Sequence, residues 1–184
     1  MKRALVILAD GCEELEAVSI IDTLRRGGVE VFAATLSGGG WANGAHGILI
    51  AADGPFDPAS AAAFDAIALP GGMGGMQRLR ADVRVLSALR AASARGAAVC
   101  AVCAAPAVLD AAGLLDSRRF CCYPGIEKTL SGAGKFVPGV PTARDGNIVT
   151  GTGPATAVRF ALEILRALGL DREADEVGAG MLVG

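Results

Sequence analysis

The chain has 184 residues, of which 52% are apolar and 4% aromatic, and its formal net charge is −2. This length predicts a single domain, 1–184, with an aliphatic core. The small charge gives no reason to expect a nucleic acid or an anionic membrane as a partner. No stretch reaches the roughly 18 uncharged apolar residues of a membrane span, so we expect a soluble cytoplasmic protein.

Strands and helices are predicted to alternate from the start of the chain. An apolar run at 4–8 predicts a strand, the amphipathic pattern at 13–26 a helix, and 29–34 a second strand. Such a βαβ unit favours a parallel sheet. A turn is expected at 37–44, and 132–144 shows no clear period. Farther along we expect strands at 48–50, 66–69, 97–102, 120–123 and 148–150, and helices at 57–63, 83–94, 104–112, 154–168 and 171–177.

The alternation predicts an α/β fold, a three-layer α/β/α sandwich around a mostly parallel sheet. Right-handed crossovers place helices on both faces of such a sheet. Ligands then bind beyond the carboxyl ends of the strands. Three loops are expected at this edge: 9–12, 70–73 and the corner at Cys103. Their convergence predicts a functional site there.

Cys103 lies at a predicted strand-to-helix corner. The strand before it is small and apolar, and Pro106 fits the first turn of the helix after it. This is the geometry of a nucleophile elbow. N–H groups at the start of a helix stabilise a thiolate, so we expect a lowered thiol pKa. The alternative is a buried cysteine that only fills space in the core.

The other cysteines do not form a recognisable framework. The chain has five, and an odd number favours free thiols over disulfides. Cys100 and Cys103 match C-x-x-C, but Cys100 lies inside the predicted strand, so a redox dithiol is not expected. Cys121 and Cys122 are adjacent, which is poor geometry for one ion, and His46 is the only histidine. We therefore expect no metal.

Common cofactor and triad motifs are also missing. In the glycine-rich stretch 71–75, Gln77 stands where a dinucleotide-binding motif needs its third glycine, so no nicotinamide or flavin cofactor is expected. His46 precedes Cys103, whereas a class I glutaminase triad needs a histidine after its cysteine. A surface turn residue is the simpler interpretation of His46.

Six short motifs, in this order and spacing, make the chain resemble a known family over nearly its whole length. They are ALVILA at 4–9, GCEELE at 11–16, DTLRR at 22–26, LPGG at 69–72, AVCAAP at 101–106 and TGPAT at 152–156. The chain resembles the ThiJ/PfpI superfamily, in the branch of the Parkinson-associated protein deglycase and its bacterial relatives. The resemblance implies the class I glutamine amidotransferase-like, flavodoxin-like form of the fold.

The resemblance also implies roles for individual residues. Cys103 matches the reactive, oxidation-prone cysteine of the family, and Glu16 matches the glutamate that hydrogen-bonds to it. Gly72 and Ala104 match the backbone N–H donors beside the sulfur. From its place on the predicted helix alone, Glu16 is equally well a solvated surface carboxylate.

Four further residues are expected around this pocket. Gly71 precedes the donor glycine. Tyr123 stands where the human-type branch has a histidine, and tyrosine is a far weaker base at neutral pH. His46 stands where that branch has an arginine. Cys12 replaces a small residue, and we hypothesise that it acts as a resolving thiol for Cys103.

By resemblance, the expected function is reactive-carbonyl defence without a cofactor, of the glyoxalase III or deglycase type. The expected substrates are small aldehydes or glycated adducts, and the expected assembly is a homodimer with the first helix near its interface. The alternative is a non-enzymatic oxidative-stress sensor or chaperone that uses oxidation of the same cysteine. Hydrolysis is disfavoured because Ala104 stands where the protease-named branch has a histidine.

Overall fold

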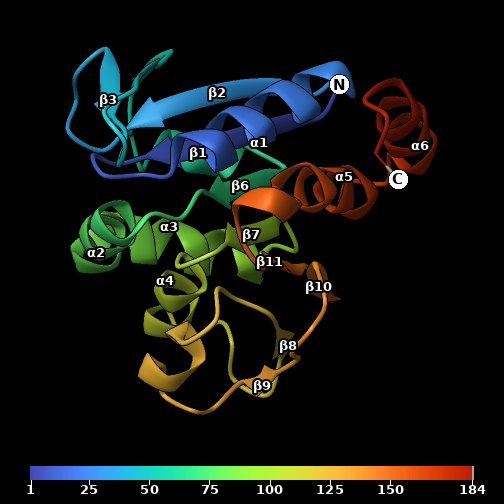
Figure 1. Ribbon diagram of the computed structural model, residues 1–184. Helices are drawn as coiled ribbons and strands as arrows, with labels where there is room; N and C mark the ends of the chain where they lie inside the picture. Colours follow the sequence, from blue (N-terminus) through green and yellow to red (C-terminus); the bar gives the residue numbers. More distant parts are fainter. Residues whose placement is uncertain (184) are drawn as a thin grey trace.

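The computed structural model describes residues 1–183, and within them a seven-stranded sheet forms the centre of the protein (Figure 1). The strand order is β10-β11-β7-β6-β1-β2-β5. Only β10 and β11 pair antiparallel, and all other neighbours are parallel. The strands are β1 (Arg3–Leu8), β2 (Glu30–Thr35), β5 (Gly54–Pro55), β6 (Ala66–Leu69), β7 (Ala98–Val102), β10 (Thr142–Asp145) and β11 (Ile148–Gly151).

Helices cover both faces of this sheet. They are α1 (Glu14–Arg26), α2 (Met73–Ala81), α3 (Val83–Ala94), α4 (Pro106–Ala111), α5 (Ala157–Ala167) and α6 (Asp171–Gly180), with 3₁₀ turns η1 (Ser60–Ala63), η2 (Ile126–Thr129) and η3 (Pro154–Thr156). The chain leaves β1 for β2 on one side and leaves β6 for β7 on the other. Right-handed crossovers therefore place α1 and α3 on opposite faces. Helix α5 packs against α1, and α2 and α3 pack with α4. The three-layer prediction is confirmed.

The central strands are buried on both faces, which explains their continuous apolar sequences. Every residue of β6 and β7 is buried, as is all of β1 except Arg3. Burying one large aliphatic side chain stabilises the fold by about 1.5–3 kcal/mol. A glycine directly after α1 allows a close contact with α5. A Cβ on Gly27 would overlap the side chain of Leu165 on α5. The end of α1 therefore rests directly on α5.

Two smaller sheets depart from the sequence prediction. Strands β3 (Trp41–Asn43) and β4 (Leu49–Ala51) form a separate antiparallel hairpin, so the predicted strand at 48–50 does not join the main sheet. The predicted turn at 37–44 ends in β3. Strands β8 (Arg119–Phe120) and β9 (Lys135–Phe136) pair in parallel, so the predicted strand at 120–123 is shorter and starts earlier. Helix α2 was not predicted, since its nine residues include two glycines.

The loops predicted to form the site do meet at the carboxyl edge of the sheet. The strand order reverses between β1 and β6, because β2 lies on one side of β1 and β6 on the other. Such a switch point is where parallel sheets bind ligands. The loops after β1, β6 and β7 all reach this edge. None of the helices in residues 1–183 is both long and apolar enough to span a membrane.

Candidate active site

Cys103 occupies a strained corner directly after β7. Its φ is 62°, in the left-handed region that few non-glycine residues adopt. Backbone hydrogen bonds fix this conformation: the Cys103 N–H donates to Gly151 O at 3.0 Å, and Cys103 O accepts from the Tyr123 N–H at 2.8 Å. Such strain persists only where the surroundings hold it, and it is common at functional sites. The elbow predicted from the sequence is therefore present.

Glu16 approaches the same corner from the first turns of α1. Its side chain is completely buried. Oε2 accepts a hydrogen bond from the Gly71 N–H at 2.7 Å, and the carboxyl group is also hydrogen-bonded with the Cys103 thiol. Oε1 is buried without a hydrogen-bond partner among the described residues. A buried oxygen without a donor favours the protonated carboxyl group, because a buried charge costs more than a neutral group.

The pKa of Glu16 is raised to about 7. Burial is the main cause, and the hydrogen bonds from Gly71 and Cys103 oppose it. Both the acid and the carboxylate are therefore populated near neutral pH. A group with such a pKa can give and take protons efficiently at that pH.

Gly71 and Gly72 bring backbone into contact with the reactive pair. A Cβ on Gly71 would lie 2.7 Å from Cys103 Cβ and 2.8 Å from Glu16 Oε2. Gly72 has a φ of 84°, and a Cβ there would overlap backbone atoms of the loop after β1. The backbone N–H groups of Gly72 and Ala104 both hydrogen-bond to the Cys103 sulfur. Two N–H groups aimed at one point can stabilise an anion there.

The expectation of a lowered thiol pKa at Cys103 is wrong. Burial, followed by the charge and hydrogen bonding of Glu16, raises the pKa of Cys103 to about 12, against the N–H groups of Gly72 and Ala104. The contributions from Glu16 as an anion disappear when it is protonated. The two groups are therefore a coupled pair that shares a proton.

The other residues predicted around the site, Tyr123, Cys12 and His46, differ in whether they contact Cys103. Tyr123 contacts Cys103 through its backbone, and a Cβ on Gly153 would touch its half-exposed ring. Cys12 is fully buried, and burial, followed by the nearby Glu14 charge, raises its pKa to about 11. No hydrogen bond within residues 1–183 joins the Cys12 or His46 side chain to Cys103. His46 instead pairs with a buried glutamate of α1.

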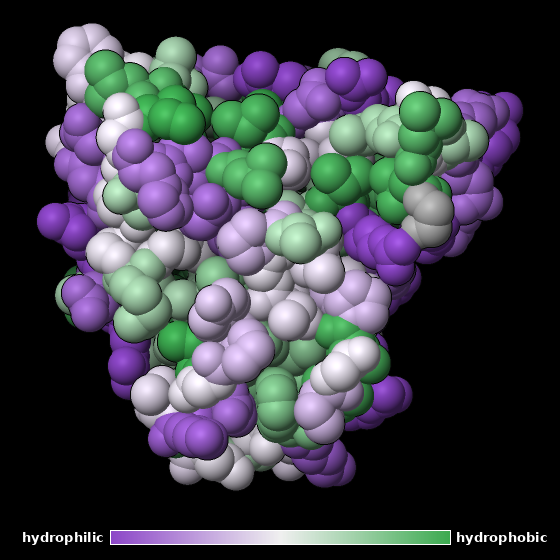
Figure 2. All heavy atoms as spheres, viewed as in Figure 1, coloured by the Kyte–Doolittle hydropathy of each residue, from purple (hydrophilic) through white to green (hydrophobic). Residues whose placement is uncertain are grey.

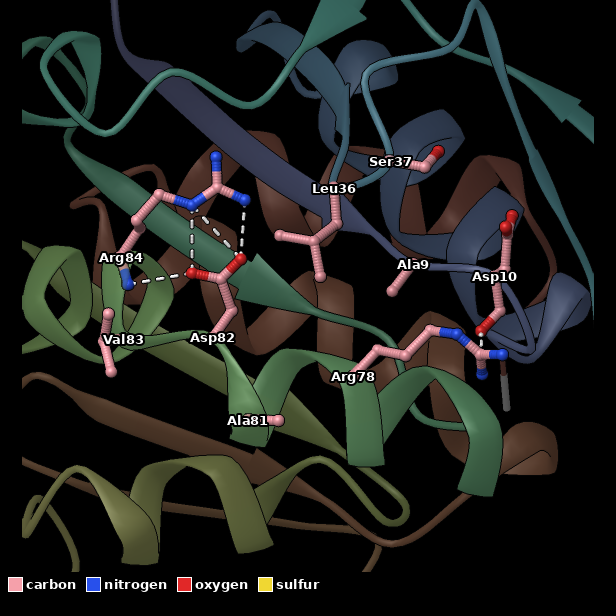
Figure 3. A pocket seen from close by; sticks show the side chains of 9 residues that line it. All are labelled: Ala9, Asp10, Leu36, Ser37, Arg78, Ala81, Asp82, Val83 and Arg84. Atoms are coloured by element: carbon pink, nitrogen blue, oxygen red, sulfur yellow. Dashed lines mark hydrogen bonds and ion pairs between the residues drawn. The ribbon is translucent and has the colours of Figure 1, made fainter.

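A cavity of about 500 Å³ lies beside the site, beyond the ends of β1 and β2 (Figure 3). Its charged side chains already have partners: Arg84 forms an ion pair with Asp82, and Arg78 donates to the carbonyls of Asp10 and Gly74. Cys103 and Glu16 do not line it. The hydrogen bond from Arg78 to the Asp10 carbonyl holds α2 against the loop after β1. The residues that line the cavity are Ala9, Asp10, Leu36, Ser37, Arg78, Ala81, Asp82, Val83 and Arg84.

Known proteins match this chain over nearly its full length. The model of the DJ-1/PfpI family matches residues 2–167. Protein dj-1beta of Drosophila melanogaster is 36% identical over 182 residues, which are 99% of this chain and 97% of that protein. Deglycase PH1704 of Pyrococcus horikoshii is 30% identical over 166 residues, which are 90% of this chain and 99% of that protein.

Solved structures agree with the sequence matches. The crystal structure of Drosophila melanogaster DJ-1beta superposes with a TM-score of 0.93 at 36% identity, covering 100% of this chain and 98% of that one. Toxoplasma gondii DJ-1, described as oxidized, gives a TM-score of 0.90 at 34% identity, covering 99% and 98%. The fold and its connections are thus shared with these proteins.

Proposed function

Because the chain belongs to the DJ-1/PfpI family, we propose that it is an enzyme of reactive-carbonyl defence, of the glyoxalase III or deglycase type, that needs no cofactor. One relative is named a deglycase. The observation that carries the proposal is the buried contact between Cys103 and Glu16, beside two inward-facing N–H groups. This contact supports the proposal because it would bring a nucleophile, a proton carrier and donors for an oxyanion together around one point.

The first step is addition of sulfur to an aldehyde. The Glu16 carboxylate takes the thiol proton of Cys103 as the sulfur attacks the aldehyde carbon of methylglyoxal. A carbon–sulfur bond forms, and the carbonyl electrons move to oxygen. The N–H groups of Gly72 and Ala104 hold this oxyanion until Glu16 protonates it. The product is a hemithioacetal, and Glu16 is left as a carboxylate.

The second step moves a proton between carbons. The Glu16 carboxylate removes the proton from C1, and the electrons of the C2 carbonyl move to its oxygen to form an enediolate. The O1 hydroxyl gives its proton to O2, and the C1 carbonyl forms as Glu16 returns its proton to C2. This gives a thioester of lactate on Cys103. Water then cleaves the thioester, which releases lactate and restores the starting pair. The net reaction is methylglyoxal plus water to lactate, with no external oxidant or reductant. A glycated amine or thiol adduct would enter at the same carbon once it releases the amine or thiol and frees the aldehyde.

Lactate formation tests the proposal. Methylglyoxal is incubated with the wild type, Cys103→Ala and Glu16→Gln, and lactate is measured by proton NMR. We expect both variants to form none, while Cys122→Ala keeps the wild-type rate because its sulfur lies outside the reactive pair. Undiminished lactate formation by Cys103→Ala would show that the mechanism is wrong.

A second function, as a peroxide sensor, is favoured by one feature. The unpartnered Oε1 of Glu16 and the N–H groups beside Cys103 offer partners for the oxygens of a sulfinic acid. A related Toxoplasma gondii protein is described as oxidized. This role is distinguished by one stable two-oxygen adduct after mild peroxide, together with negligible carbonyl turnover. A chaperone-like role would use the same oxidation.

We further propose that the protein acts as a homodimer through the outward face of α1. Leu15 and Val18 are exposed on this helix, and Ile48 and Leu49 are exposed on the β3–β4 hairpin. Figure 2 shows apolar surface on the side where α1 and this hairpin lie. Burying these side chains would stabilise a pair of chains. A cytoplasmic location stays a prediction.

A further inference from the structure

A second cluster of chemically active side chains lies at the start of α1, under the β3–β4 loop. Glu13, Glu14 and His46 each offer one ligand atom, and these atoms all lie within 4.8 Å of one another. His46 Nδ1 is 2.8 Å from Glu14 Oε2 and 4.0 Å from Glu13 Oε1. We propose that these three residues bind a divalent transition-metal ion, with Zn²⁺ as the probe. The proposal does not depend on the carbonyl chemistry of Cys103.

One oxygen of each carboxylate accepts backbone hydrogen bonds, and the other oxygen faces the imidazole of His46. Oε2 of Glu13 accepts the backbone N–H of Glu16 at 2.7 Å, which leaves Oε1 free. Oε1 of Glu14 accepts the backbone N–H of His46 at 2.5 Å and that of Ile48 at 3.4 Å, so that Oε2 faces the imidazole. Hydrogen bonds of this kind orient metal ligands in known sites. Glu14 Oε2 is hydrogen-bonded to His46 Nδ1, and Glu13 Oε1 lies 4.0 Å from the same nitrogen, so a bound ion would replace this hydrogen bond.

The negative charge of the two carboxylates lacks a permanent counter-ion. The side chain of Glu14 is 5% exposed and that of Glu13 is 14% exposed. Within residues 1–183, neither forms an ion pair with a lysine or arginine, and His46 is their only basic partner. Buried charges in proteins are normally paired or bind a metal. Hydrogen bonds hold the Glu14 carboxylate in place, and a cation would balance the negative charge that the two carboxylates keep.

The loop that carries His46 is held against α1. Gly44 lies so close to Glu14 that a Cβ there would overlap its side chain. The Ala45 N–H donates to Cys12 O at 2.8 Å, and Gly44 and Cys12 form an isolated parallel β-bridge. These contacts fix the imidazole beside the carboxylates. The His46 side chain is 70% exposed in the single chain, so an ion can reach it from solvent there.

The geometry and ligand chemistry favour Zn²⁺ over Mg²⁺ or Ca²⁺. Tetrahedral Zn²⁺ places nitrogen and oxygen ligands about 3.3–3.5 Å apart. This separation lies between the 2.8 Å and 4.0 Å distances from His46 Nδ1 to the Glu14 and Glu13 oxygens. Imidazole nitrogen suits transition ions, whereas Mg²⁺ and Ca²⁺ prefer oxygen alone. Three protein ligands leave one coordination position open. No metal was expected from the sequence, because only the folded hairpin brings His46 to Glu13 and Glu14.

Calorimetric titration of chelator-treated protein with ZnCl₂ tests the proposal. We expect one ion per chain, with an affinity reduced by at least about tenfold in His46→Ala, since losing even an outer-shell partner costs about 10- to 100-fold. His46→Ala removes an exposed side chain, and its fold is checked by circular dichroism. Cys103→Ser is the control for thiol binding, and Glu30→Gln is the control for loss of a surface carboxylate. Both controls should bind as the wild type does.

Cobalt provides a second readout that does not depend on affinity. Co²⁺ bound to nitrogen and oxygen gives ligand-field bands without the strong sulfur-to-metal band of a thiolate site. We expect this spectrum in the wild type and in Cys103→Ser, and its loss in His46→Ala. The proposal is overturned by absence of Zn²⁺ binding in the wild type, by unchanged binding in His46→Ala, or by a sulfur-to-cobalt band that disappears in Cys103→Ser.

Discussion

Oε2 of Glu16 accepts a hydrogen bond from the backbone N–H of Gly71 at 2.7 Å, across 55 positions of sequence. The bond joins the first helix to the loop after β6 at a completely buried atom. Because the donor belongs to the backbone, it holds the carboxyl group in place whatever its protonation state. The other oxygen, Oε1, is left for a proton or a substrate atom. This contact therefore orients the proton carrier of the proposed reaction.

We predict that Glu16→Gln changes how stability depends on pH. The folded pKa of Glu16 is about 7, above its ordinary value of 4.5. The folded state therefore holds this proton more tightly than the unfolded state does. The stabilising contribution of the neutral carboxyl group is present below pH 4.5 and is lost as the pH rises to about 7. The full difference is about 3 kcal/mol.

Glutamine stays neutral at every pH, so the free energy of unfolding of Glu16→Gln does not contain the decrease that ionisation of Glu16 causes in the wild type. The free energy of unfolding is measured with urea at a series of pH values from 4 to 8, in the presence of a chelator. We expect the stability of Glu16→Gln relative to the wild type to rise across this interval and then level off. Glu30→Gln, at an exposed position on β2, is the matched control. A constant difference between Glu16→Gln and the wild type would contradict the prediction.

We predict that Gly71→Ala disrupts the reactive pair. A Cβ at this position would lie within 3.0 Å of Cys103 Cβ, Glu16 Oε2 and Ala104 N. These atoms must separate, which breaks the contact on which the proposed proton transfer depends. Gly40→Ala is the control, because a Cβ there meets nothing within 4 Å. Lactate formation and the rate of Cys103 alkylation should change in Gly71→Ala only. Wild-type values in Gly71→Ala would mean that the tight packing has no functional role.

Local sequence patterns predicted the centre of the fold better than its edges. The apolar runs of β1, β6 and β7 are continuous because both of their faces are buried, so each was recognised without knowledge of its partners. Helix α2 was missed because glycine disfavours helix formation and two glycines follow Met73. The β3–β4 hairpin depends on pairing between segments, which periodicity does not report.

The site could be predicted only in part, because local sequence patterns do not report contacts between distant segments. The strand-to-helix change placed Cys103 at a corner, since Pro106 marks the start of the helix. Glu16 was selected by the family resemblance, because helical spacing does not distinguish a solvated carboxylate from a buried one. The raised pKa of Cys103 depends on burial and on the charge of Glu16. Both follow from contacts between distant segments, which no local motif records.

We predict that Val18→Lys converts a dimer into a monomer. Val18 is 51% exposed on the outer face of α1. A lysine at the centre of an apolar interface would have to be buried without a partner, which is costly. Light scattering after gel filtration measures the mass, with the 18.4 kDa chain as the monomer reference. Val83→Lys is the control, because Val83 is 73% exposed but lies at the start of α3. A dimer of unchanged stability in Val18→Lys would exclude the α1 face.

Peroxide is predicted to oxidise Cys103 before the other four cysteines. Cys103 is 8% exposed, whereas the others are between 0% and 2% exposed. Access to the oxidant therefore favours Cys103, and the N–H groups of Gly72 and Ala104 beside its sulfur stabilise the reactive thiolate. Peptide mass spectrometry after mild treatment should find a two-oxygen adduct on the peptide that contains Cys103. First oxidation at Cys122 or Cys121 would contradict this order.

The same experiment tests whether Cys12 is a resolving thiol. A disulfide between Cys12 and Cys103 would consume both thiols and prevent the two-oxygen adduct. Cys12 is fully buried and makes no hydrogen bond to Cys103 in the described part of the chain. We therefore expect the wild type and Cys12→Ala to give the same adduct in the same yield. If the wild type instead gives the disulfide, and only Cys12→Ala accumulates the sulfinic acid, Cys12 acts as the resolving thiol.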